Sequence, residues 1–154
     1  MITAGASMIL ATNFNLDIIK ALTGFLGIAF IAGSSAAINQ ILDFKYDSVM
    51  ERTVKRPIVT GKISVTSATM FASFLFIAGS ALILYFNNFL TWVLTFGTWI
   101  FYAFFYTKVL KFSGSQNIVI GGLAGAMPPL LGWTAVVGSI CLLYTSPSPR
   151  DKTP

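Results

Sequence analysis

Long apolar segments make up most of the sequence, and they limit the folds that the chain can adopt. Of its 154 residues, 55% are hydrophobic and only 10% are charged. A soluble domain carries about 25% charged residues, so this chain has too few to cover a soluble surface. A helix of about 20 apolar residues crosses the hydrocarbon core of a bilayer. The sequence therefore predicts an all-α fold, a polytopic bundle of transmembrane helices.

Four segments are long enough to be complete spans: residues 17 to about 42, about 65 to 86, 89 to about 107, and 117 to 140. Residues 1–11 are apolar but too short to cross, so we expect them to be the end of a helix that begins earlier. Small residues in the first two spans favour close helix packing, with substrate lining as the alternative. Aromatic residues in the third span favour an interfacial belt, with an apolar pocket as the alternative.

Charged residues gather in one polar stretch, residues 39–62, which holds three of the five acidic and five of the ten basic residues. A shorter basic loop, residues 108–116, contains Lys108 and Lys111. If the spans alternate in direction, both loops lie on one side, and Lys and Arg mark the cytoplasmic side. We therefore expect a multi-pass protein of the inner (plasma) membrane, with loops 43–64 and 108–116 in the cytoplasm. Basic residues between apolar spans make a nucleic-acid-binding surface a poor alternative.

A stripe of oxygen ligands begins the polar stretch. Asn39, Asp43 and Asp47 are four residues apart, which places them on one face of a helix at steps of about 6 Å. Such ligands suit Mg²⁺, which binds proteins through one or two carboxylates together with substrate phosphates. The sequence contains no His and one Cys, so a nitrogen or sulfur metal cluster is excluded. Ionisable groups on a membrane helix indicate a functional site, and we predict Mg²⁺ here.

Three cations, Arg52, Lys55 and Arg56, follow the stripe directly. Arg binds phosphate with two parallel hydrogen bonds, and Lys binds it as a point charge. Carboxylates for a metal followed by cations indicate a diphosphate site. The alternative is a helix end whose charges reach into water, with basic residues that act only as topology signals. The residues alone leave these two interpretations about equally open.

The polar stretch belongs to a longer pattern, N-Q-x-x-D-x-x-x-D-x-x-M-x-R-T-x-x-R-P-x-x-x-G-x-I-S, which begins at Asn39. A second block comprises Tyr106-Thr107, Leu110-Lys111 and NIVIGGLAGAMPPLLGW at 117–133. The two blocks resemble the UbiA superfamily of intramembrane prenyltransferases, and most of all its heme-farnesylating members. The resemblance covers roughly residues 20–140. The Gly-Gly…Pro-Pro…Gly-Trp block argues against the ubiquinone-type relatives.

The resemblance implies an enzyme that transfers the farnesyl group of farnesyl diphosphate to a vinyl group of heme b, giving heme O. Mg²⁺ is the implied cofactor, and heme b is a substrate. The implied catalytic residues are Asp43, Asp47 and Arg52, and the implied metal ligands are Asn39, Asp43 and Asp47. The implied diphosphate-binding residues are Asn39, Arg52, Lys55 and Arg56.

Three other functional interpretations remain. One is a UbiA-type prenyltransferase that acts on an aromatic quinone precursor, and another is an inactive truncated membrane fragment. A transporter or structural membrane subunit is the third, and it would need polar residues along the middle of the spans, which are apolar here.

Family members have about nine membrane helices and a second aspartate-rich motif, so the resemblance makes residues 1–140 a partial prenyltransferase domain. The last residues, 141–154, read CLLYTSPSPRDKTP. This string resembles translated sequencing-adapter read-through, and the alternative is a genuine disordered C-terminus. We expect residues 141–154 to be an unstructured tail that is not native, and the sequence to be a fragment.

Overall fold

The computed structural model describes residues 1–13, 15, 17–47, 53, 55–106 and 117–140. Its helices are α1 (Ile2–Ala11), α2 (Ile18–Leu42), α3 (Phe44–Asp47), α4 (Val65–Phe86), α5 (Phe89–Ile100), the π-helix η1 (Phe101–Tyr106) and α6 (Asn117–Val137). These described parts of the chain contain helices and turns but no strand, which confirms the predicted all-α fold. The predicted tail, 141–154, lies outside them.

Two helices, α2 and α4, are each long and apolar enough to cross a membrane. Their bounds agree with the first two predicted spans. The third predicted span, 89 to about 107, is divided, because α5 ends at Ile100 and the chain continues as a π-helix to Tyr106. The fourth begins at residue 117 as predicted, and its helix ends at Val137 rather than at residue 140.

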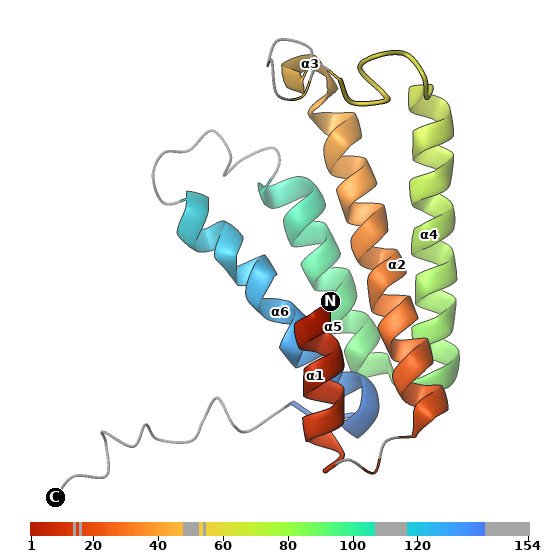
Figure 1. The fold of residues 1–154 in the computed structure, drawn as a ribbon, viewed down its shortest axis with the longest axis vertical. Helices are drawn as coiled ribbons and strands as arrows, with labels where there is room; N and C mark the ends of the chain where they lie inside the picture. The colour runs from red at the N-terminus through yellow and green to blue at the C-terminus, as the bar shows by residue number, and fades with distance from the viewer. Residues whose placement is uncertain (14, 16, 48–52, 54, 107–116, 141–154) are drawn as a thin grey trace, which may run out of the picture.

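The helices form a bundle whose two ends differ in chemistry. The antiparallel helices α2 and α4 make the most extensive helix contact, and α1 packs mainly on α6. In Figure 1, α3 and the connection to α4 lie at the top, whereas the turn between α4 and α5 lies at the bottom. The described part of the charged stretch therefore sits at one end of the bundle. The helix ends that flank residues 107–116 also lie at the top.

The contact between α2 and α4 depends on two glycines. A Cβ on Gly79 would lie 2.8 Å from the carbonyl oxygen of Gly27 and 2.8 Å from Cγ1 of Ile31. A Cβ on Gly27 would lie 2.6 Å from Cγ1 of Ile83. Only a residue without a side chain allows this approach of two backbones, as is common where membrane helices pack. Here the small residues serve helix packing, as the sequence predicted.

Two asparagines join three helices at the end of the bundle opposite the described part of the charged stretch 39–62. The Asn87 amide donates from Nδ2 to the carbonyl oxygens of Lys20 on α2, at 2.8 Å, and Ala135 on α6, at 3.0 Å. Asn88 donates from Nδ2 to the Thr134 carbonyl oxygen at 2.7 Å, and its Oδ1 caps α5 by accepting from the Thr91 backbone N–H at 2.8 Å. We name this group of contacts the asparagine clamp. It fixes the relative positions of α2, α5 and α6.

We predict that Gly79→Ala lowers the stability of the bundle by about 1–3 kcal/mol, the usual cost of overpacking a close contact. The matched control is Gly97→Ala, because a Cβ at Gly97 has no neighbour within 4 Å. Replacing a helical Gly by Ala at an open position is neutral or stabilising. The measurement is the unfolding transition in detergent, followed by circular dichroism. Equal transitions for the two variants would contradict the glycine contact.

Candidate functional site

The backbone keeps the predicted acidic stripe in helical register although α2 ends at Leu42. The N–H of Asp43 donates to the carbonyl oxygen of Asn39 at 2.9 Å, and the N–H of Asp47 donates to that of Asp43 at 2.8 Å. Both are bonds between residues four apart, as in an α-helix. The hydrogen bonds between residues four apart therefore continue from α2 into the short helix α3. The three residues follow one another at one-turn steps at the charged end of the bundle.

Both carboxylates of the stripe are buried. Asp43 is 4% exposed and Asp47 is 3% exposed. Oδ2 of Asp47 accepts a hydrogen bond from Nη1 of Arg56, and the two side chains form an ion pair. The hydroxyl of Thr53 donates to the backbone carbonyl oxygen of Asp47 at 3.1 Å. Thr53 and Arg56 thus both lie against Asp47.

The predicted cations do not share one environment. Arg56 lies against Asp47, whereas the side chain of Lys55 is exposed to solvent. Arg52 lies outside the described residues, as does the predicted basic loop 108–116. Asn39 is half-buried on the last turns of α2. The structure therefore brings Arg56 to Asp47, with Asp43 and Asn39 at successive one-turn steps before Asp47.

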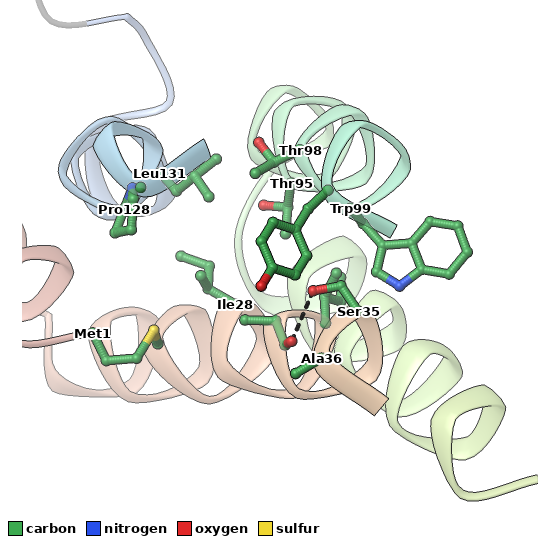
Figure 2. Close-up of a pocket in the computed structure, with 13 residues that line it drawn as sticks. Met1, Ile28, Ser35, Ala36, Thr95, Thr98, Trp99, Pro128 and Leu131 are labelled. Carbon is green, nitrogen blue, oxygen red and sulfur yellow. Dashed lines mark hydrogen bonds between the residues drawn. The ribbon is translucent and has the colours of Figure 1, made fainter. Parts of the chain in front are cut away.

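A cavity of about 340 Å³ lies between α2, α5 with η1, and α6, at the low end of the range of about 300–1,000 Å³ for ligand pockets. Figure 2 shows Ile28, Ser35 and Ala36 on its α2 side, Thr95, Thr98 and Trp99 on its α5 side, and Pro128 and Leu131 on its α6 side.

The Ser and Thr hydroxyls in the cavity wall donate within their own helices. The hydroxyl of Ser35 donates to the Ala32 carbonyl oxygen at 2.8 Å. Those of Thr95 and Thr98 donate to the carbonyl oxygens four residues earlier, at 2.7 Å and 2.8 Å. Their hydrogens therefore point away from a ligand, and the cavity presents an essentially apolar wall. Such a space suits a hydrocarbon chain better than a polar group.

The aromatic residues of the third span form a row along α5. The rings of Trp92 and Phe96 stack at 5.2 Å between centroids, and those of Phe96 and Trp99 stack at 6.0 Å. Phe76 of α4 packs against the last two. Nε1 of Trp99 donates to Oγ of Ser34 at 3.2 Å, which ties the row to α2. The row is thus core packing, and its Trp99 end lines the cavity, as one of the two sequence interpretations held.

The cavity and the carboxylates lie along the same helix. Ala36, which lines the cavity, precedes Asp43 by seven residues. At 1.5 Å per residue this is roughly 10 Å along the helix axis. The polar and apolar surfaces along α2 therefore follow the order that a molecule with a charged head and an apolar tail needs. The head would lie near Asp43 and the tail in the cavity.

The donor set of the stripe fits a hard divalent ion. Among the described residues, no group of three or more His, Cys, Asp and Glu side chains gathers. The stripe instead supplies the two carboxylates of Asp43 and Asp47 and the amide oxygen of Asn39. Mg²⁺ is held in this way in proteins, because substrate phosphates and waters complete its shell. The chemistry of these residues is compatible with Mg²⁺, with Arg56 as a competitor for one oxygen of Asp47.

Thr53 and the Ser and Thr residues of the cavity wall are not among the site residues predicted from the sequence. Thr53 is 4% exposed and hydrogen-bonds to the backbone of Asp47. The sequence does contain a signal for it, since Thr53 follows Arg52 within the recognised pattern. The sequence contains no comparable signal for the cavity, because Ser and Thr are common in membrane helices.

We predict that Thr53→Val lowers stability by about 1 kcal/mol, the net value of a typical hydrogen bond, because it removes the donor to Asp47. Thr53→Ser retains the hydroxyl and is the control. The measurement is the rate of proteolytic cleavage between α3 and α4, together with thermal unfolding. Equal behaviour of the Val and Ser variants would show that the hydroxyl contributes nothing.

Comparisons with known proteins show which family the chain belongs to. The protoheme IX farnesyltransferase of Stutzerimonas stutzeri (strain A1501) is 49% identical over 140 residues, which are 91% of this chain and 47% of that protein. The protein of the same name from Legionella pneumophila (strain Paris) is 56% identical over 115 residues, 75% of this chain and 39% of that protein. The chain thus spans about half the length of the curated relatives it matches.

A solved structure from work on digeranylgeranylglyceryl phosphate synthase in membranes superimposes with a TM-score of 0.75 at 29% identity, over 88% of this chain and 47% of that one. The sequence pattern of the UbiA prenyltransferase family matches residues 1–149. The family and the apolar helices make this a multi-pass membrane protein. The chain belongs to the UbiA prenyltransferase family.

Proposed function

We propose that the protein transfers the farnesyl group of farnesyl diphosphate to a vinyl group of heme b, giving heme O, with the help of Mg²⁺. The observation that carries the proposal is the pair of buried carboxylates that directly follow α2, the helix whose Ile28, Ser35 and Ala36 line an apolar cavity. The choice of heme b rests on the relatives named protoheme IX farnesyltransferase. The Gly-Gly…Pro-Pro…Gly-Trp block in 117–133 also supports this choice.

In this proposal the site divides the substrate by polarity. Asp43 and Asp47, with Asn39, would hold Mg²⁺, which neutralises charge on the bound diphosphate. Arg52, Lys55 and Arg56 would bind diphosphate oxygens, and the exposed Lys55 is accessible to an anion that arrives from water. The farnesyl chain would extend along α2 into the cavity. The hydroxyls of Ser35, Thr95 and Thr98 in its wall donate within their own helices, so they present little polarity to the chain.

The reaction itself needs charge stabilisation more than proton transfer. The allylic C–O bond breaks with both electrons on the diphosphate oxygen, and the electrons of the vinyl double bond form the new C–C bond. The cation left on the vinyl carbon takes up water, which loses a proton. Positive groups fixed beside the departing diphosphate lower the barrier to the first step, because they stabilise the charge that develops there. The dry cavity keeps water away from the farnesyl chain.

The topology follows from the same placement. The charged end of the bundle, with loops 43–64 and 108–116, would face the cytoplasm of a cell whose inner (plasma) membrane holds the protein. A diphosphate would then reach Lys55 and Arg56 from the aqueous phase, and the lipid-like tail would enter from the bilayer. Exposed apolar side chains on α4, such as Phe71, Phe74 and Ile77, provide a surface suited to lipid.

We predict that Asp43→Asn and Asp47→Asn each lower heme O formation by about 100-fold or more, the range seen when a charge-stabilising group is removed from an active site. The measurement is pigment extraction and chromatography of membranes that contain the whole gene product. Asp17→Asn is the control, because Asp17 caps α2 away from the stripe. Its effect should be confined to stability.

The acceptor is tested in the same membranes. Heme b and 4-hydroxybenzoate are offered in turn with labelled farnesyl diphosphate. Label in heme O supports the proposal. Label in the aromatic acid would show that the acceptor is a quinone precursor and not heme b. Label in neither compound, with the protein inserted in the membrane, would contradict prenyl transfer to both acceptors.

A further inference from the structure

The ion pair between Arg56 and Asp47 places a cation where the proposed metal would bind. Nη1 of Arg56 donates to Oδ2 of Asp47. The carboxylate is 4% exposed, whereas the side chain of Arg56 is 33% exposed. A guanidinium in this position uses one oxygen of the carboxylate and repels an arriving cation. Asp47 is therefore a weak metal ligand for as long as Arg56 stays there.

The backbone around the ion pair is held by contacts that do not involve the guanidinium. Thr53 donates its hydroxyl to the carbonyl oxygen of Asp47 at 3.1 Å, and the N–H of Arg56 donates to the carbonyl oxygen of Thr53 at 3.0 Å. Ile58, which is 8% exposed, anchors the following turn in the bundle. Gly61 has φ +73°, which allows the chain to turn towards α4. The guanidinium can therefore leave Asp47 while its backbone stays in place.

We propose that Arg56 occupies Asp47 as an internal cation until a diphosphate arrives, so that metal and diphosphate bind together. The inference rests on the proposed function. Diphosphate oxygens offer the guanidinium a two-pronged, charge-assisted partner outside the buried position. When Arg56 turns to the diphosphate, the carboxylate of Asp47 becomes an uncompensated buried charge, which is costly and favours a metal ion. Each ligand thus raises the affinity for the other by the same factor.

Two simpler roles for Arg56 make different predictions for metal binding without diphosphate. If Arg56 only holds the loop in place, its removal weakens metal binding, because Asp47 loses its orientation. If Arg56 only binds diphosphate, its removal does not change the metal affinity. If Arg56 exchanges Asp47 for the diphosphate, as proposed, its removal strengthens metal binding, because the competing cation is gone. We call this movement the exchange. The sign of the effect separates the three roles.

The test measures Mn²⁺ affinity by electron paramagnetic resonance of the free ion, with the purified chain in nanodiscs of zwitterionic lipid and with no diphosphate present. Arg56→Gln should bind Mn²⁺ roughly tenfold more tightly than the unaltered protein, a factor that corresponds to about 1.4 kcal/mol. Arg56→Lys retains the charge on a more strongly hydrated group, so its affinity should lie between the two. Asp47→Asn should lose the site.

The matched control is Lys62→Gln, which removes one positive charge from the exposed side chain of Lys62 in the same connection. Its Mn²⁺ affinity should equal that of the unaltered protein. Equal strengthening in Lys62→Gln and Arg56→Gln would mean a general charge effect and would overturn the exchange. Unchanged or weaker binding by Arg56→Gln would also overturn it. If Arg56→Gln does not fold by gel filtration, the sign of the Arg56→Lys effect decides in the same way.

The same titration, repeated with farnesyl diphosphate, separates this inference from the proposed function. If Mn²⁺ binds neither the variants nor the unaltered protein, with or without farnesyl diphosphate, the proposed metal site is contradicted. The exchange is then contradicted as well. The result that the exchange requires is Mn²⁺ that binds the unaltered protein more tightly with farnesyl diphosphate than without it, and that binds Arg56→Gln tightly even without it. Equal Mn²⁺ affinity in all folded proteins would overturn the exchange, but it would remain consistent with the proposed metal site.

Discussion

The need to give backbone polar groups a partner inside an apolar medium governs this structure. In a bilayer, an unpaired backbone N–H or C=O costs several kcal/mol, so chain ends of helices are the difficult places. Three helices begin with a side chain that accepts from their first backbone N–H groups: Asp17 for α2, Ser64 for α4 and Asn88 for α5. Polar residues in this chain thus concentrate at helix ends, where they are needed.

The same requirement explains the form of the charged end. The stripe leaves α2 at Asp43, where an ordinary helix end would turn into solvent. Here the chain continues for one more turn as α3, and Thr53 and Arg56 supply partners for Asp47. Both carboxylates of the stripe are buried instead of being hydrated. A buried carboxylate interacts strongly with whichever cation is present, since little water screens it.

The sequence predicted the fold well where long apolar segments end in residues that cap helices. The bounds of α2 and α4 follow from such segments, which begin directly after the capping residues Asp17 and Ser64. The change from α5 to a π-helix at Phe101 has no such signal, because the aromatic run continues through it. Spacing along a helix predicted the order of Asn39, Asp43 and Asp47. It was unable to predict that Arg56 contacts Asp47, because loop residues have no fixed period relative to the helix before them.

The asparagine clamp has a consequence for the biogenesis of the protein. Asn87 uses one amide group to bind carbonyl oxygens of α2 and α6, and α6 is the last of these segments to be synthesised. Until α6 enters the membrane, half of this contact is missing, and the amide must find water at the bilayer surface. The α4–α5 turn is therefore held at the interface during insertion, which keeps the two helices in a hairpin. Arrival of α6 then closes the bundle from the end opposite the carboxylates.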